Sequence, residues 1–227
     1  MVNSSWFEAV DTEHWSVAKY VQEHIMVPTG GSDDAYTTAH KMRTRERILD
    51  SARRLFTRTG YENVTIDDVM AHAGLTRGGF YNHFSNKADL FAAAVETYTV
   101  TTPWEADDAD SADQSADSLA RWLIEFYLSD DMLRDVEVKC PLYGLPNDIS
   151  RAGSAPRDAY TRLIQRTAQV FRKAMSPRRD ASTRAEAILS LCVGAMLLAS
   201  TTDQPILSTS LRSSAKRQAL ALLQDQD

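Results

Sequence analysis

The fold of this chain is decided by the stretch Thr65–Leu90, which reads TIDDVMAHAGLTRGGFYNHFSNKADL. Asp68 follows Thr65 by three residues, and this pairing predicts a capped helix that ends before Gly74. A turn with the sequence Ala-Gly-Leu follows, and then a second helix over Thr76–Phe84. Two short helices joined by such a turn form a helix-turn-helix, in which the second helix enters the major groove of DNA.

Further helices are predicted on either side of this motif. Residues 43–60 carry an apolar face and end at Gly60, which suits the left-handed conformation that often closes a helix. Asn86 is the predicted N-cap of a helix that has Asp89 at its third position and ends before Pro103. Together these segments make a helical domain.

The second helix of the motif carries side chains suited to reading DNA. Phe80 and Phe84 are spaced to face inward. Gly78 and Gly79 each cost a helix interior about 1 kcal/mol relative to Ala, and a bare patch of backbone is explained if a DNA strand approaches closely. Hydrogen-bond donors and acceptors are expected on the exposed side, namely Thr76, Arg77, Tyr81, Asn82 and His83.

Charge is distributed unevenly along the 227 residues. The formal net charge is −6, but residues 41–87 hold 9 basic and 5 acidic residues. A basic segment on an acidic body argues against a general nucleic-acid coat protein and favours a compact DNA-binding surface. The two cysteines, Cys140 and Cys192, lack the spacing of a structural zinc site, so neither a metal nor a cofactor is expected.

Membrane and secretion signals are not expected. The longest apolar run, residues 187–199, is shorter than the roughly 20 residues that span a bilayer, and Ser190 and Gly194 interrupt it. The N-terminus lacks the basic and apolar regions of a secretory signal. We therefore expect a cytoplasmic protein without a membrane-spanning segment.

Composition divides the chain into four parts and predicts an all-α fold. Residues 1–41 read as an N-terminal extension, with a short helix and then a linker around Pro28. Residues 42–103 form the helix-turn-helix domain with its connecting helix, and the acidic residues 104–117 read as a linker. Residues 118–227 are expected to form helices over 118–128, 155–175, 183–200 and 208–223, with an irregular segment at 140–149.

The order of residues in the motif resembles the DNA-binding domain of the TetR family of bacterial transcriptional regulators. The resemblance covers about 60 of the 227 residues and includes the helix before the motif. Met70 stands where the family usually has Ala, and Asn86 where it usually has Ser. The matching positions are Thr65, Ala73, Gly74, Leu75, Thr76, Gly78, Phe80, Tyr81, His83, Phe84, Lys87, Asp89 and Leu90.

The resemblance implies roles for individual residues in binding DNA. Arg77 would read a base, because its guanidinium can pair with O6 and N7 of guanine. Weaker candidates for such contacts are Thr76, Gly78 and Asn82. Phosphate contacts are implied for Thr65, Tyr81, His83 and Lys87, the last aided by a helix N-terminus.

The arginines of the preceding helix leave two alternatives open. They either flank the duplex, as proposed for Arg43, Arg45 and Arg47, or form a solvated helix face. The remaining members of this set are Arg53, Arg54 and Arg58.

The C-terminal half offers candidates for a ligand cavity, since apolar walls with a few polar groups are what such cavities require. The candidates are Trp122, Phe126, Tyr127, Cys140, Tyr143 and Tyr160; each is otherwise plain core. Lys139 beside Cys140 would favour a thiolate, so Cys140 is also a candidate sensor of electrophiles or oxidants. The alternative is a small buried hydrophobe.

The resemblance implies a homodimeric repressor that binds a palindromic double-stranded operator and leaves it when a small-molecule effector binds. The last two long helices are expected to form the dimer interface. Two other hypotheses are a DNA-binding protein without an effector and an enzyme that uses Cys140. No catalytic constellation accompanies that cysteine, so an enzyme is not expected.

Overall fold

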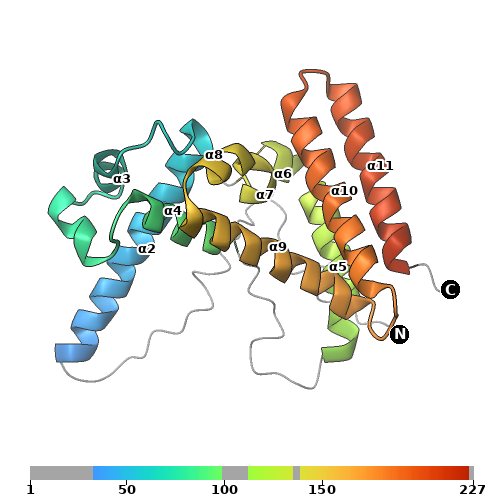
Figure 1. Ribbon diagram of the computed structural model, residues 1–227, viewed down its shortest axis with the longest axis horizontal. Coiled ribbons are helices and arrows are strands. Elements are labelled where there is room, and N and C mark those ends of the chain that lie inside the picture. The colour runs from blue at the N-terminus through green and yellow to red at the C-terminus, as the bar shows by residue number, and fades with distance from the viewer. Residues whose placement is uncertain (1–32, 99–111, 135–138, 225–227) are drawn as a thin grey trace. The chain divides into compact units, whose positions relative to one another are not determined.

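The computed structural model describes residues 33–98, 112–134 and 139–224. Every regular element in these ranges is a helix, which confirms the predicted all-α fold (Figure 1). The chain divides into two compact units, residues 1–46 and residues 47–227. The helix-turn-helix and the C-terminal helices both belong to the second unit.

Helix α2 runs from Asp33 to Thr59 and crosses from the first unit into the second. It begins earlier than the predicted start near residue 42, because no Gly or Pro interrupts the chain between Gly31 and Gly60. Its predicted end is confirmed: Gly60 has a φ of +82° and donates its N–H to the carbonyl of Phe56. The short helix predicted before Pro28 lies outside the described residues.

Three short helices follow α2, namely α3 (Ile66–His72), the 3-10 helix η2 (Arg77–Asn82) and α4 (Lys87–Glu96). The capping box is confirmed, since Thr65 Oγ1 accepts from the Asp68 N–H at 3.1 Å and Asp68 Oδ2 accepts from the Thr65 N–H at 2.8 Å. Asn86 caps α4 as predicted. The tighter, shorter η2 replaces the predicted helix over 76–84, in agreement with the weak helix propensity of its two glycines.

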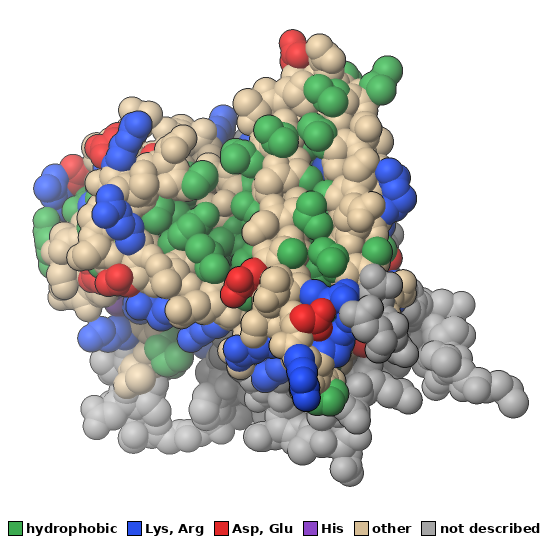
Figure 2. Space-filling view, turned by 45° about the vertical axis from the view of Figure 1, so that its right-hand side comes forward, with side chains coloured by type: hydrophobic (Ala, Val, Ile, Leu, Met, Phe, Trp, Pro, Cys, Tyr) green, Lys and Arg blue, Asp and Glu red, His purple; other side chains and the backbone are tan. Residues whose placement is uncertain are grey.

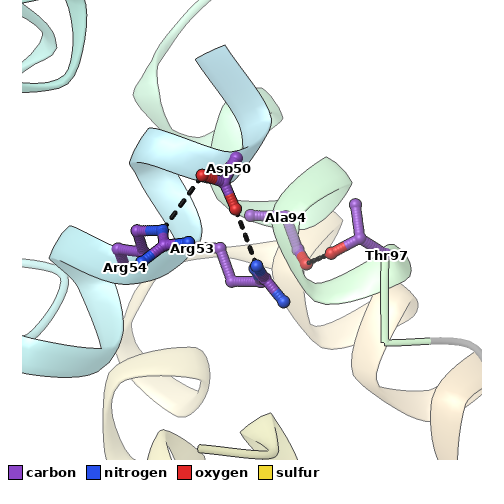
Figure 3. Close-up of polar contacts among 5 residues, drawn as sticks. All are labelled: Asp50, Arg53, Arg54, Ala94 and Thr97. Atoms are coloured by element: carbon purple, nitrogen blue, oxygen red, sulfur yellow. Dashed lines mark hydrogen bonds and ion pairs between the residues drawn. The ribbon is translucent and has the colours of Figure 1, made fainter. Parts of the chain in front are cut away.

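Two arginines of α2 are bound to Asp50, and one of them is buried. Arg53 is only 8% exposed and donates to Asp50 Oδ1 at 2.7 Å, while Arg54 Nε donates to Oδ2 at 3.0 Å (Figure 3). Burial raises the pKa of Asp50, but the hydrogen bonds and charges of both arginines bring it below its usual value. The Arg53 guanidinium also lies 5.7 Å from the ring centre of Tyr98. The interpretation of Arg53 as a solvated residue is therefore wrong.

Seven helices of the C-terminal half are described. Helix α5 begins inside the segment predicted to be an acidic linker, and residues 140–149 form two short helices rather than an irregular piece. Both short helices begin with a proline, which fits the first helical position because its missing N–H is not needed there. The helices are α5 (Ala112–Tyr127), α6 (Asp130–Arg134), α7 (Pro141–Gly144), α8 (Pro146–Arg151), α9 (Ser154–Ala174), α10 (Ala181–Thr201) and α11 (Pro205–Gln224).

Helix α4 packs against α9 and thereby joins the helix-turn-helix to the C-terminal helices. Leu142, Leu145 and Leu163 belong to the same hydrophobic core as Phe56 and Leu90 of the DNA-binding half. A second core lies between α5, α9, α10 and α11. The predicted boundary at the acidic linker therefore does not separate two independent cores.

Helix α10 extends beyond both ends of the apolar run at residues 187–199. By length and composition it could cross a bilayer, and it is the one described helix that meets this test. The core helix of a soluble protein meets the same test, and Ile188, Cys192 and Met196 of α10 are buried in the second core. Its apolar character is thus accounted for by packing.

Candidate nucleic-acid interface and C-terminal cluster

The turn between α3 and η2 is fixed by local and distant hydrogen bonds. Gly74 has a φ of +65°, which favours glycine, and the Leu75 N–H donates to the Met70 carbonyl at 2.8 Å. Arg47 of α2 donates from Nη2 to the Ala73 carbonyl at 2.6 Å, at the C-terminal end of α3, where a positive charge is favourable. This contact gives Arg47 a structural role in the turn, and its proposed place beside the duplex stays a prediction.

Helix η2 buries its aromatic side and exposes its polar side. Phe80 is fully buried, with its ring centre 5.2 Å from that of Tyr81 and 5.8 Å from that of Phe84, which is also buried. The predicted inward position of both phenylalanines is confirmed. His83 is half-buried, and the exposed candidates are Thr65, Thr76, Arg77, Gly78, Tyr81 and Asn82.

The two glycines of η2 have different surroundings. A Cβ added at Gly78 would meet no described atom within 4 Å, whereas a Cβ at Gly79 would lie 3.7 Å from Cε of Met70. Gly79 therefore faces the interior beside Met70, and Gly78 leaves the backbone open on the polar side of η2.

Arg77 has a partner that the sequence analysis missed. Its Nη1 donates to Oδ2 of Asp67, in the first turn of α3, at 2.6 Å. The one signal in the sequence is that Asp67 stands next to Asp68. Asp68 forms the capping box, so the carboxylate of Asp67 has no helix-capping role. A contact across the turn of the motif cannot be identified from that signal alone.

Lys87 and Thr65 also have partners within the protein. Lys87 Nζ lies 4.2 Å from the ring centre of Tyr61 and 3.4 Å from the carbonyl oxygen of Glu62. The Thr65 hydroxyl donates to Asp68 Oδ2 at 2.6 Å, and this hydrogen bond is the main cause of a lowered pKa at Asp68. Phosphate contacts by Lys87 and Thr65 stay predictions.

Four of the six candidate ligand residues gather around α7. The Tyr143 hydroxyl donates to the Met132 carbonyl at 2.9 Å, and the Tyr160 hydroxyl donates to the Leu142 carbonyl at 3.0 Å. The Tyr127 ring meets that of Tyr143 edge-on at 5.7 Å between ring centres. We call this set, Tyr127, Cys140, Tyr143 and Tyr160, the tyrosine–cysteine cluster.

Tyr127 differs from the other two tyrosines of the cluster. Its hydroxyl is buried beside Cys140 without a well-formed hydrogen bond to any described residue, and burial raises its pKa well above the usual value. The other two candidates, Trp122 and Phe126, stack on each other with ring centres 4.9 Å apart, and Trp122 is 37% exposed.

The two cysteines are both held in the thiol form. Burial raises the pKa of Cys140 to about 11 and that of Cys192 to about 12. The expectation that Cys140 is a thiolate beside Lys139 is therefore wrong, because burial disfavours the charged form of the thiol. Among the described residues, no three His, Cys, Asp or Glu side chains are grouped so that they could hold a metal ion.

Comparison with known sequences identifies the motif. The family model of bacterial regulatory proteins, tetR family, matches residues 48–94. The HTH-type transcriptional regulator TtgR of Pseudomonas putida is 35% identical over 78 residues, which are 34% of this chain and 37% of TtgR. The matches thus span about a third of the length of such curated relatives.

Solved structures extend the similarity to the C-terminal helices. A complex of SmeT with triclosan has a TM-score of 0.58 at 21% identity and covers 79% of this chain and 90% of SmeT, which shows a shared fold. The regulatory protein TetR from Rhodobacter sphaeroides has a TM-score of 0.51 at 25% identity, over 77% of this chain and 97% of that chain. Residues 48–94 therefore match the DNA-binding part of bacterial regulatory proteins of the tetR family, and the described helices share the fold of such regulators.

Proposed function

We propose that this chain binds operator DNA as a homodimer and represses transcription until a small-molecule effector releases it. The observation that carries the proposal is the capped helix-turn-helix, in which buried Phe80 anchors η2 while Arg77, Tyr81 and Asn82 face solvent. The family match over residues 48–94 supports it. Because the operator is chromosomal, the proposal implies a cytoplasmic protein.

Arg77 is the proposed base-reading residue. Its Nε and Nη2 have no hydrogen-bond partner within the described part of the chain, so two parallel donors remain for O6 and N7 of guanine. We assign further base contacts to Thr76, Gly78 and Asn82. Phosphate contacts are proposed for Thr65, Tyr81, His83 and Lys87.

The tyrosine–cysteine cluster, with Trp122 and Phe126 on the same helix as Tyr127, is the proposed effector site. Its side chains are apolar or neutral, and the hydroxyls of Tyr143 and Tyr160 donate to backbone carbonyls rather than to charged groups. A neutral, largely apolar effector fits this chemistry, with an acceptor for the buried Tyr127 hydroxyl. The SmeT complex with triclosan supports a small organic molecule.

Release would be transmitted through α7, which contributes side chains to both cores, and through α8, which packs in the first core. Tyr143 of α7 lies in the second core, and Leu142 beside it lies in the first. Asp148 of α8 accepts a hydrogen bond from the Tyr61 N–H at 2.8 Å, at the end of α2. An effector that moves α7 would move the helix-turn-helix, so the two motifs of a dimer would no longer match major grooves about 34 to 36 Å apart.

The proposed dimer interface is the outer face of α10 and α11. Figure 2 shows hydrophobic side chains along this face, and exposed ones include Leu197, Leu198, Ile206 and Leu207. A Cβ at Gly194 would meet no described atom, so a second copy can approach closely there. The opposite side of these two helices is intramolecular core and is not part of the proposed interface; it includes Ile188, Cys192, Ala195, Ala215, Ala219 and Leu223.

The proposal is tested by comparing two variants on DNA. Arg77→Ala should lower affinity for a selected operator by about 1 to 3 kcal/mol and relax the preference at one base pair. Lys87→Ala should weaken binding to all duplexes alike and reduce the salt slope by about one. Fluorescence anisotropy on operator and random duplexes measures both. Equal losses on both duplexes for Arg77→Ala would remove it from the base-reading role.

A further inference from the structure

We propose that Asp67 is a positioning residue for DNA recognition, which holds Arg77 in the orientation that reads a guanine and disfavours other sequences. The inference rests on the proposed function and deepens it. The starting observation is the ion pair of Arg77 Nη1 with Asp67 Oδ2, 2.6 Å apart. This pair joins the first turn of α3 to the first residue of η2, the two helices of the motif.

Asp67 has little to contribute to the stability of the free protein. The capping of α3 is performed by Thr65 and Asp68. The side chains of Arg77 and Asp67 are 62% and 56% exposed, and ion pairs this exposed add little to folding stability. The pair of Asp50 with Arg53 is different, because Arg53 is buried. We therefore expect Asp67 to influence DNA binding rather than folding, because the surface around it loses water when DNA binds.

The ion pair leaves the Nε and Nη2 groups of Arg77 available to bind a base. Asp67 engages Nη1, and Nε and Nη2 keep no partner among the residues that the structure describes. The planar guanidinium presents these two groups as parallel donors, which is the arrangement that O6 and N7 of guanine accept. Because Asp67 restricts the long Arg77 side chain before DNA arrives, less conformational entropy is lost on binding.

The same carboxylate penalises the wrong binding mode. If Arg77 turns to a phosphate, as on non-specific DNA, Asp67 loses its partner next to a negatively charged backbone. If Arg77 faces a guanine, the pair is kept and the negative charge of Asp67 stays compensated. A repulsive element of this kind raises specificity without adding a contact to the correct site.

The experiment uses the full chain and randomised duplex DNA. The wild type first enriches a consensus duplex from the randomised library. Fluorescence anisotropy then measures Kd of the wild type, Asp67→Asn, Arg77→Ala and the double variant. The duplexes are the consensus, single base-pair variants of it and a random sequence. Glu62→Gln is the matched control, because it removes one negative charge from another exposed residue of the motif region. Thermal unfolding establishes that each variant is folded.

We expect Asp67→Asn to lower the ratio of consensus to random affinity about threefold to tenfold. The loss should fall at the base pair that Arg77→Ala also affects, and it should vanish in the Arg77→Ala background. If Asp67→Asn discriminates as the wild type does, or shifts every duplex by the factor seen for Glu62→Gln, the inference is wrong and the DNA-binding function stands. A wild type that enriches no consensus contradicts the proposed function and this inference together.

Discussion

At the scale of single residues, a substitution at Gly78 tests whether DNA packs directly on the protein backbone. A methyl group there meets no described atom within 4 Å, and Gly78 is not among the glycines with positive φ. Gly78→Ala should therefore keep or raise the free energy of unfolding by up to about 1 kcal/mol. If DNA packs on this backbone, the same methyl should weaken operator binding by about tenfold, the loss of one or two contacts.

Gly79→Ala is the matched control, since it makes the same chemical change on the inner side of η2, beside Met70. Denaturant unfolding and anisotropy titrations on the same preparations separate the two effects. Operator affinity of Gly78→Ala equal to that of the wild type would show that the open backbone is not a DNA contact.

Residue roles were predictable where a local rule determines them. Thr65, Asn86 and Gly60 occupy the cap positions that their spacing predicts, and Phe80 faces inward as its position in the motif requires. The partners of arginines were not predictable. Arg47 reaches Ala73 across 26 residues of sequence, a separation at which a single sequence carries no pairing signal. The prediction of a lowered pKa at Cys140 was wrong for the same reason, because the burial of a side chain depends on the tertiary structure.

At the scale of elements, α8 is held to the end of α2 by one hydrogen bond that can be removed. Asp148 Oδ1 accepts from the Tyr61 N–H at 2.8 Å, and a Cβ at Gly60 would lie 3.3 Å from the same oxygen. Asp148→Ala leaves this partly buried N–H without its charged acceptor. The free energy of unfolding should fall by about 1 to 2 kcal/mol, and amide hydrogen exchange at Tyr61 should accelerate.

Asn147→Ala is the control on the same short helix, because Asn147 is exposed and its backbone carbonyl, which the substitution keeps, accepts from the Ser150 hydroxyl. Denaturant unfolding compares the two variants, and exchange measured by NMR reports on the Tyr61 amide. Equal unfolding free energies for both variants would contradict a stabilising link between α8 and α2.

Helix boundaries were predictable where the chain carries start and stop signals. Helices α3 and α9 to α11 begin and end close to their predicted positions, because caps, glycines or prolines mark them. Helix α4 begins at its predicted cap but ends at Glu96, well before the predicted end at Pro103. Helices α6 to α8 are too short for an apolar period to emerge, and they form because packing against longer helices stabilises them. The early start of α2 was not predicted because residues 33–41 contain no Gly or Pro that would mark a helix boundary.

At the scale of the whole molecule, the proposal requires two copies. One helix-turn-helix presents only one recognition element, and an operator with two half-sites requires a second one at a fixed distance. Helices α10 and α11 pack closely on each other and leave apolar side chains on their outer face. Ile206 at the start of α11 is 88% exposed, and together with the exposed Leu198 and Leu207 it adds to the apolar surface of these two helices.

Leu198→Glu tests this interface. Leu198 is 56% exposed on α10, so the substitution should leave the fold of one copy intact, but it would place an uncompensated charge in the buried interface of a dimer. We expect sedimentation velocity to show a dimer for the wild type at micromolar concentration and a monomer for the variant, with operator affinity lowered at least a hundredfold, about 3 kcal/mol. Ile164→Glu on α9, which changes another exposed apolar residue outside α10 and α11, should stay dimeric. A monomeric wild type, or a Leu198→Glu variant that dimerises as the wild type does, would rule out this face as the interface.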